Sequence, residues 1–318
     1  MSKDYKYFFA TDIHGSEVCL KKFLNSGKFY DVDAIIMGGD ITGKMIVPVV
    51  QGANGNYSAS LFGRKRVVQI DELPLLIKMI SDAGFYPHQM SEDELQHLKD
   101  NPASVDALFS ELMKNTIANW LDLAENRLQG TGIEVIFAPG NDDPFFIDEM
   151  LSSNELVINP DGQVIELPGG FPMISIGYSN ITPWSSPREL EESALQTVID
   201  QQVAKLDNLD NAIFNLHVPP KDTTLDQAFL LDDEFRPVMK SGSPVIAGVG
   251  SSAVRDSLQK YQPLMSLHGH IHESRGEARL GRTLAINPGS EYSEGILRGV
   301  IVSMSAKKGV KGYQFVSG

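Results

Sequence analysis

The sequence predicts an α/β fold with ligand-bearing loops at the ends of its strands, and two observations support this. An apolar strand over residues 5–11, a helix over 17–26 and a second apolar strand over 34–38 follow one another near the N-terminus. That is the order of a strand–helix–strand unit. Polar residues also stand directly after each strand, and open α/β sheets place their ligands at the carboxyl ends of the strands.

The pattern changes after residue 43. Two apolar runs flank Asn54-Gly55, a dipeptide that strongly favours a hairpin turn. A short helix is expected over 74–83, and Ser91 with Glu94 has the spacing of a capping box that opens another helix. We interpret residues 44–102 as a cap insertion beside the site.

Alternating helices and strands return at residue 105, where apolar residues recur at helical spacing until Gly130. We expect helices over 105–128, 189–206 and 251–261, and strands over 134–138, 164–167, 173–177, 212–216, 264–267, 283–286 and 299–304. No internal repeat or low-complexity segment interrupts this order.

Composition narrows the function classes. The chain has 318 residues and a formal net charge of −14, so a broad nucleic-acid surface, which needs clustered Lys and Arg, is not expected. No apolar stretch approaches the roughly 20 residues of a membrane span. A single cysteine, Cys19, excludes an internal disulfide and favours a reducing compartment. We therefore expect a cytoplasmic protein without membrane contact and interpret Cys19 as structural.

Five short segments, each ending a hydrophobic run, contain the candidate chemistry. They are Asp12-Ile13-His14, Gly39-Asp40, Gly140-Asn141-Asp142-Asp143, His217 and His268-Gly269-His270-Ile271-His272. In extended backbone, residues two apart lie on the same side, so a pair such as Asp12 and His14 can face one ion. Carboxylate, amide and imidazole groups without a thiolate suit manganese, iron or zinc. Together the segments predict a metal site at the strand ends.

In this order the segments resemble the calcineurin-like metallophosphoesterases, whose pattern is D-x-H, G-D, G-N-H-[DE], H and G-H-x-H. The resemblance extends from Asp12 to His272. It implies a four-layer αββα sandwich, forming one domain over 1–318 with a hairpin and helix insertion at about 44–102. It also implies two divalent metal ions: Mn, Fe or Zn. One would be held by Asp12, His14, Asp40 and His272, and the other by Asp40, Asn141, His217 and His270, with Asp40 as the bridge.

The same resemblance implies a dinuclear metal-dependent phosphoric ester hydrolase that uses a metal-bridging hydroxide. A small phosphodiester is favoured over a monoester, by analogy with family members that lack the motif histidine. Two alternatives stay open. One is a hydrolase of a nucleotide or sugar-nucleotide pyrophosphate linkage, and the other is a non-catalytic metal-binding scaffold of the same fold. A homo-oligomer also stays open.

Asp142 departs from the family pattern, because it stands where a histidine is expected. An ionised aspartate would repel phosphoryl oxygens, and it could act as an acid only if its pKa were raised. The candidate catalytic residues are Asp142, Asp143 and His268. Asp143 aligns with an acidic residue that orients a site histidine in the family. His268 is either a replacement for the missing imidazole or a packed histidine near the site.

Three further segments have weaker signals. Asn287-Pro288-Gly289-Ser290 resembles a turn of bacterial and archaeal family members. Arg64-Lys65-Arg66 could reach a substrate anion, but a solvated strand face is the better interpretation. For Trp184, core packing is favoured over lining a pocket.

Overall fold

The computed structural model describes residues 4–232 and 234–318. Its first main sheet has six strands, in the order β22 (Gly309–Ser317), β21 (Arg298–Ser305), β1 (Asp4–Ala10), β2 (Ala34–Met37), β7 (Glu134–Phe137) and β8 (Val157–Ile158). The strands from β1 to β8 run parallel, whereas β21 and β22 pair antiparallel at one side. The parallel part places the carboxyl ends of β1, β2 and β7 at one edge.

The second main sheet also has six strands. Their order is β19 (Gly276–Leu280), β20 (Thr283–Asn287), β18 (Met265–Leu267), β13 (Ile213–Leu216), β10 (Phe171–Ile176) and β9 (Val164–Leu167). The four inner strands are parallel, and the two outer strands are antiparallel to their neighbours. The carboxyl ends of β13 and β18 therefore lie together.

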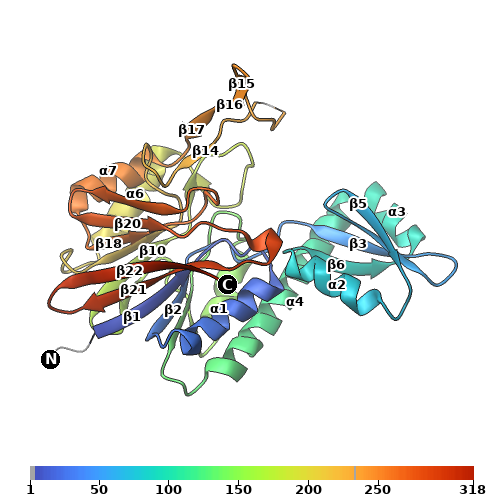
Figure 1. Cartoon of the computed structure of the whole chain (residues 1–318), viewed down its shortest axis with the longest axis horizontal. Coiled ribbons are helices and arrows are strands. Elements are labelled where there is room, and N and C mark those ends of the chain that lie inside the picture. The colour runs from blue at the N-terminus through green and yellow to red at the C-terminus, as the bar shows by residue number, and fades with distance from the viewer. Residues whose placement is uncertain (1–3, 233) are drawn as a thin grey trace.

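Alternating side chains divide the interior into layers, as the pleat of a strand requires. In β1, Tyr7 and Phe9 point into a core shared by the two sheets, whereas Phe8 points into a core beneath helices. The helices on this first sheet are α1 (Glu17–Phe29), α4 (Pro102–Leu128) and α5 (Phe146–Ser152). The second sheet packs on α6 (Glu192–Val203) and α7 (Ser252–Tyr261). Figure 1 shows these helices on opposite outer sides, and the predicted α/β class is confirmed.

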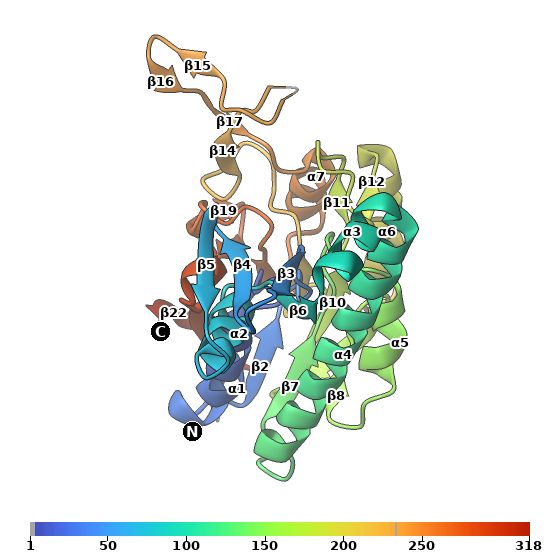
Figure 2. The same ribbon diagram turned by 90° about the vertical axis from the view of Figure 1, so that its right-hand side faces the viewer.

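Residues 44–102 form a smaller sheet with its own hydrophobic core, which lies to one side of the main sheets in Figure 1 and in front of them in Figure 2. Its strands and helices are β5 (Arg64–Val68), β4 (Tyr57–Leu61), β3 (Ile46–Gln51), β6 (Tyr86–Met90), α2 (Leu73–Asp82) and α3 (Glu92–Asp100). The Asn54-Gly55 turn joins β3 to β4, and Ser91 and Glu94 form the predicted capping box. The second of the two apolar runs that flank Asn54-Gly55, residues 57–69, forms two strands, separated by a turn at Phe62-Gly63.

Two parts of the chain differ from the sequence prediction. The helix expected from residue 189 begins at Glu192, because β12 (Glu189–Leu190) pairs with β11 (Ser179–Asn180). A projecting arm was also not predicted. It contains β14 (Gln227–Phe229), β15 (Met239–Lys240), β16 (Ser243–Pro244) and β17 (Ile246–Gly248), and it extends from the body in Figure 2. Strands this short have too few residues to show an alternating pattern.

The longest helix, α4, has 27 residues and packs one side on the first sheet. Trp120 lies within that packed side, and its indole N–H donates to Glu17 Oε1 at 2.7 Å. Neither α4 nor any other helix within residues 4–232 and 234–318 is long and apolar enough to cross a membrane.

Candidate metal centre

The predicted ligands come from loops at the carboxyl ends of both main sheets. Asp12 and His14 follow β1, Asp40 follows β2, and Asn141 follows β7. From the second sheet, His217 follows β13, and the segment from His268 to His272 follows β18. Packing the sheets face to face brings these loops into one cluster, although they are up to about 260 residues apart in the sequence.

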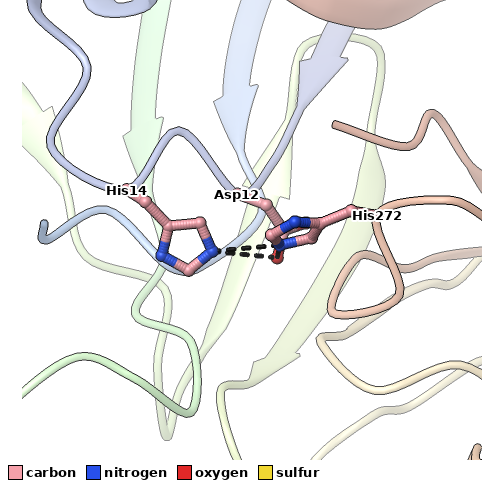
Figure 3. Close-up of side chains that lie close together, drawn as sticks. All are labelled: Asp12, His14 and His272. Atoms are coloured by element: carbon pink, nitrogen blue, oxygen red, sulfur yellow. Dashed lines mark hydrogen bonds and ion pairs between the residues drawn. The ribbon is translucent and has the colours of Figure 1, made fainter. Parts of the chain in front are cut away.

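One group of potential ligands consists of Asp12, His14 and His272. Figure 3 shows both imidazole rings turned toward the Asp12 carboxylate. The Nε2 atoms of His14 and His272 are 3.0 Å apart, and His272 Nε2 is 3.5 Å from Asp12 Oδ1. The backbone N–H of His270 donates to Asp12 Oδ1 at 3.0 Å and so fixes the orientation of the Asp12 carboxylate.

A second group consists of Asp40, His217 and His270. His217 Nε2 lies 3.4 Å from Asp40 Oδ2. Asn141 adds a neutral oxygen, since its Oδ1 is 2.7 Å from His270 Nδ1. The two histidines of the His270-Ile271-His272 segment thus belong to different groups.

The backbone of these loops is unusual. Asp12, His14, Asp40 and His270 all have positive φ, at 55°, 39°, 53° and 65°. Non-glycine residues pay a conformational cost there, which persists only where surrounding contacts fix the backbone. Those contacts include the Asp12 N–H to Gly39 O bond at 2.9 Å and the His14 N–H to Asp40 O bond at 3.0 Å.

Gly39 shows how closely the loops approach each other. A Cβ atom at this position would lie 2.3 Å from His217 Nδ1, closer than real atoms come. Gly39 also has a φ of 140°, a backbone conformation that residues with a side chain rarely adopt. The Gly39-Asp40 dipeptide is therefore needed to admit the His217 ring beside Asp40.

The chemistry of the cluster fits metal ions. His217 is fully buried, and neither of its ring nitrogens has a hydrogen-bond partner among residues 4–232 and 234–318. A ring N–H that is buried without an acceptor costs about 1–3 kcal/mol. Coordination would use a ring nitrogen that is otherwise unsatisfied. Two carboxylates, an amide and several imidazoles are also a suitable set for Mn, Fe or Zn.

Electrostatics within the cluster favour bound positive charge. Burial raises the pKa of Asp40 to about 6. Burial alone would lower the pKa of His217, but the Asp40 and Asp12 carboxylates raise it to about 9. Burial would also raise the pKa of Asp12, yet the hydrogen bond from His272 and the charge of His217 hold it below its usual range. Protons on these groups must leave before a metal ion binds, so metal affinity should rise with pH.

Asp142 forms a third group of potential ligands with His14 and Asp40. Its Oδ1 accepts from Ser186 Oγ at 2.6 Å, and its Oδ2 is 2.9 Å from Lys44 Nζ and 3.8 Å from His14 Nδ1. Although burial opposes ionisation, Lys44 and His14 hold the pKa of Asp142 below its usual range. A proton donor needs a raised pKa instead, so this environment does not support Asp142 as a general acid.

Asp143 is fully buried and takes a different role from the predicted one. Its carboxylate accepts hydrogen bonds from the backbone N–H groups of Ile41, Thr42 and Gly140 and from Thr42 Oγ1, at 2.7–3.0 Å. These bonds tie the loop after β2 to the loop after β7. The expectation that Asp143 orients a site histidine is corrected, because backbone and threonine donors occupy both of its oxygens.

His268 is also corrected as a candidate catalytic residue. Its Nδ1 lies 2.7 Å from Leu216 O, and its Nε2 lies 2.8 Å from Ser266 Oγ. Burial lowers the pKa of His268 to about 4, so the ring is neutral at pH 7. Both nitrogens are engaged inside the second sheet, and His268 belongs to none of the potential ligand groups in the described residues. Of the two interpretations of His268, the structure therefore supports a packed histidine near the site and not a replacement for the missing imidazole.

The Asn287–Ser290 turn, predicted only as a turn, supports the ligand loops directly. Asn287 Nδ2 donates to Gly269 O at 3.2 Å and to Ile271 O at 3.0 Å. Ser290 Oγ donates to Asp12 O at 2.6 Å. The turn therefore fixes the loop after β18 against the loop after β1.

Sequence reasoning missed Arg188, which is 1% exposed. Its Nε donates to Asp143 O at 2.8 Å, and its Nη2 pairs with Asp148 Oδ1 at 2.7 Å. Lys44, Ser186 and Tyr292 were missed as well; the Tyr292 ring lies 4.8 Å from the His14 ring, centroid to centroid. These residues belong to no sequence motif. Only their closeness to the strand ends in the folded structure identifies them as part of the site.

The remaining sequence candidates lie away from the ligand groups. Arg64, Lys65 and Arg66 are exposed on β5, as expected for a solvated face. Cys19 is buried in α1, in agreement with a structural role. Trp184 does not pack in the core as predicted: it is 60% exposed and stacks on Phe235, with ring centroids 4.6 Å apart.

Comparison with known proteins supports the fold. No family model matches the chain. An uncharacterized protein of Methanocaldococcus jannaschii, MJ1162, is 29% identical over 158 residues, which cover 49% of this chain and 64% of that protein. The match thus spans less than two thirds of that relative.

Two solved structures cover 99% of this chain and 99% of their own. One is TT1561 of Thermus thermophilus, with 11% identity and a TM-score of 0.54, and the other has 15% identity and a TM-score of 0.55. An archaeal phosphodiesterase is also matched, with 13% identity, but its TM-score of 0.38 adds nothing to the argument. The chain therefore has the same overall fold as these two solved structures.

Proposed function

We propose that this protein is a metal-dependent phosphoesterase that hydrolyses a small phosphodiester. The observation that carries the proposal is the position of Asp40. Its Oδ2 lies 3.4 Å from His217 Nε2 and 3.5 Å from His14 Nε2, so one carboxylate contacts both ligand groups. This is the position that a carboxylate shared by two ions would occupy.

The residues that would hold two ions follow from the two groups. Asp12, His14, Asp40 and His272 would hold one, and Asp40, Asn141, His217 and His270 would hold the other. When bound, two such ions neutralise phosphoryl oxygens and acidify a water for in-line attack. Manganese, iron and zinc all suit this ligand set.

The fold holds the metal-ligating side chains in fixed positions, away from solvent. Asp12, Asp40, Asn141 and His217 are at most 2% exposed. Backbone bonds, the Asn287–Ser290 turn and the Asp143 carboxylate fix the loops that carry them. Positioning and charge neutralisation are the main demands of phosphoryl transfer, and a preorganised cluster meets both.

The preference for a diester rests on Asp142. Its side chain is 23% exposed beside His14, and its pKa lies below the usual range, so it is negative at pH 7. A monoester carries about 1.5 to 2 negative charges at pH 7, whereas a diester carries one. The carboxylate therefore repels a monoester more strongly.

Turnover by reconstituted protein tests the proposal. Protein stripped with EDTA and reloaded with Mn²⁺ would be assayed on bis(p-nitrophenyl) phosphate, p-nitrophenyl phosphate and ADP-ribose. We expect metal-dependent hydrolysis, fastest on the diester. The Asp40→Asn variant should be inactive, and Asp122→Asn, which changes an exposed acid on α4, serves as the matched control.

Three other outcomes separate the alternatives. Hydrolysis of ADP-ribose alone would favour cleavage of a pyrophosphate linkage. Bound metal without turnover of any substrate would favour a non-catalytic scaffold. No bound metal would contradict the proposal as a whole.

A further inference from the structure

The position that the family pattern assigns to a histidine is occupied here by an ion pair. Asp142 Oδ2 lies 2.9 Å from Lys44 Nζ. The same carboxylate is fixed from its other side by Ser186 Oγ, at 2.6 Å from Oδ1. The Asp142 backbone N–H donates to Asp40 Oδ1 at 2.9 Å, so the loop is fastened directly to the proposed metal cluster.

Lys44 reaches this point from the loop between β2 and β3. Its side chain is 45% exposed, so the ammonium group remains accessible from solvent. Its charge acts on His14, Asp40, Asp142 and Tyr292. An ammonium carries three N–H donors, and Asp142 is the one acceptor that Lys44 contacts among the described residues. Two donors can therefore face an incoming anion.

An exposed ion pair is often only a surface contact worth about 0–1 kcal/mol. This pair differs in its setting. The Asp142 carboxylate has three fixed neighbours, Ser186, Asn141 and His14, and it lies beside the ring of a proposed metal ligand. Lysine is also a compact point charge on a flexible stem, suited to a phosphoryl oxygen. The pair has no net charge, and it presents an ammonium group where Asp142 alone would present only a negative charge.

We propose that Lys44 is a further catalytic residue, which binds a non-bridging oxygen of the substrate phosphoryl group in place of the missing imidazole. Asp142 is then a positioning residue, which holds the ammonium at the edge of the cluster. This inference rests on the proposed phosphoesterase function. It also explains how a singly charged diester can be accepted beside Asp142, since Lys44 offsets part of the repulsion from the carboxylate.

The first test replaces Lys44 in the full-length, Mn²⁺-loaded protein. We expect Lys44→Met to lower kcat/KM on bis(p-nitrophenyl) phosphate by about 10- to 100-fold, the range of one charge-assisted hydrogen bond. The inhibition constant of inorganic phosphate should rise by about tenfold. Bound manganese and the melting temperature should not change. Lys99→Met, an exposed lysine on α3, is the control and should match the wild type.

A double-mutant cycle tests whether Asp142 acts through Lys44. Asp142→Asn should lower kcat/KM in the wild-type background and have no further effect in the Lys44→Met background. A purely structural role would instead give the same loss in both backgrounds. Loss of manganese from Asp142→Asn would identify Asp142 as a metal ligand and overturn its positioning role.

These experiments distinguish an error about Lys44 from an error about the phosphoesterase activity. If the wild type hydrolyses the diester and Lys44→Met is unchanged within about twofold, the Lys44 inference is wrong and the phosphoesterase stands. A Lys44→Met variant that has lost manganese would show a structural lysine and would also overturn the inference. If the wild type binds manganese but has no turnover, the phosphoesterase proposal itself fails, whatever the Lys44 variants do.

Discussion

The floor of the site and its rim are built in different ways. The floor comprises Asp12, Asp40 and His217, which are at most 2% exposed and are surrounded by backbone hydrogen bonds and other ligands. The rim comprises Lys44, Asp142 and Ser186, which are partly exposed and contact one another mainly through side chains. The difference implies that the floor is fixed by the fold, whereas rim residues can change with little cost in stability and set what the site accepts.

The largest expected effect is the loss of a floor residue that belongs to both ligand groups. Asp40→Asn removes a charge from the cluster and should lower turnover by at least about 100-fold, since even residues that only support a metal ligand cost about 10–100-fold when mutated. Bound metal should fall with it. Metal analysis and kinetics on the same preparation measure both. Turnover above about a tenth of the wild-type rate would show that the floor does not depend on this carboxylate.

The next effect compares a buried ion pair with the rim pair. Arg188→Met leaves Asp148 and Asp161 without their partner and the Asp143 carbonyl without its donor, and it should lower the free energy of unfolding by about 3–5 kcal/mol. Lys44→Met should change it by less than about 1 kcal/mol. Urea denaturation monitored by circular dichroism gives both values. Equal losses would contradict the distinction between the buried residues that support the ligand loops and the exposed residues of the rim.

Asp143, which joins the loops after β2 and β7 beneath the floor, tests its corrected assignment. In Asp143→Asn an amide NH₂ would face two N–H donors, so about 2–3 kcal/mol of stability should be lost from broken buried hydrogen bonds. Thermal and urea unfolding of the metal-free protein report this without involving turnover. A variant that stays as stable as the wild type but loses activity would restore the catalytic role that the sequence had predicted.

The smallest effect is expected for an exposed aromatic residue. The chain has two tryptophans, which form a matched pair. Trp184→Ala should lower the free energy of unfolding by about 1 kcal/mol or less, because only its stacking on Phe235 is lost. Trp120→Ala, which empties a buried position, should cost about 3–5 kcal/mol. A large loss at Trp184 would show that this loop is part of the rigid framework.

Much of the floor could be predicted from the sequence, because ligand types at strand ends form an ordered pattern. Asp12, His14, Asp40 and His217 follow strands that a short apolar run already indicates. Of the two interpretations of His268, the replacement for the missing imidazole is not supported, for a physical reason. That interpretation assumed extended backbone, but His270 has φ of 65°, which interrupts the alternation of sides.

The rim could not be predicted in the same way. Lys44, Ser186 and Arg188 lie in loops, where no periodicity relates a residue to its neighbours in space. Lys44 and Asp142 meet across about 100 residues of sequence, and nothing near either one indicates the other. Trp184 was assigned to the core because large aromatic residues are usually buried, but the loop between β11 and β12 leaves it exposed.

The central claim is that two metal ions bound by this cluster support phosphodiester hydrolysis. Its most direct test is a Mn²⁺ titration of metal-free protein, with bis(p-nitrophenyl) phosphate turnover recorded at each metal-to-protein ratio. We predict that turnover rises to a plateau at two equivalents of manganese per chain and is absent without metal. Turnover that is independent of manganese, or two bound equivalents without any turnover, would contradict the claim.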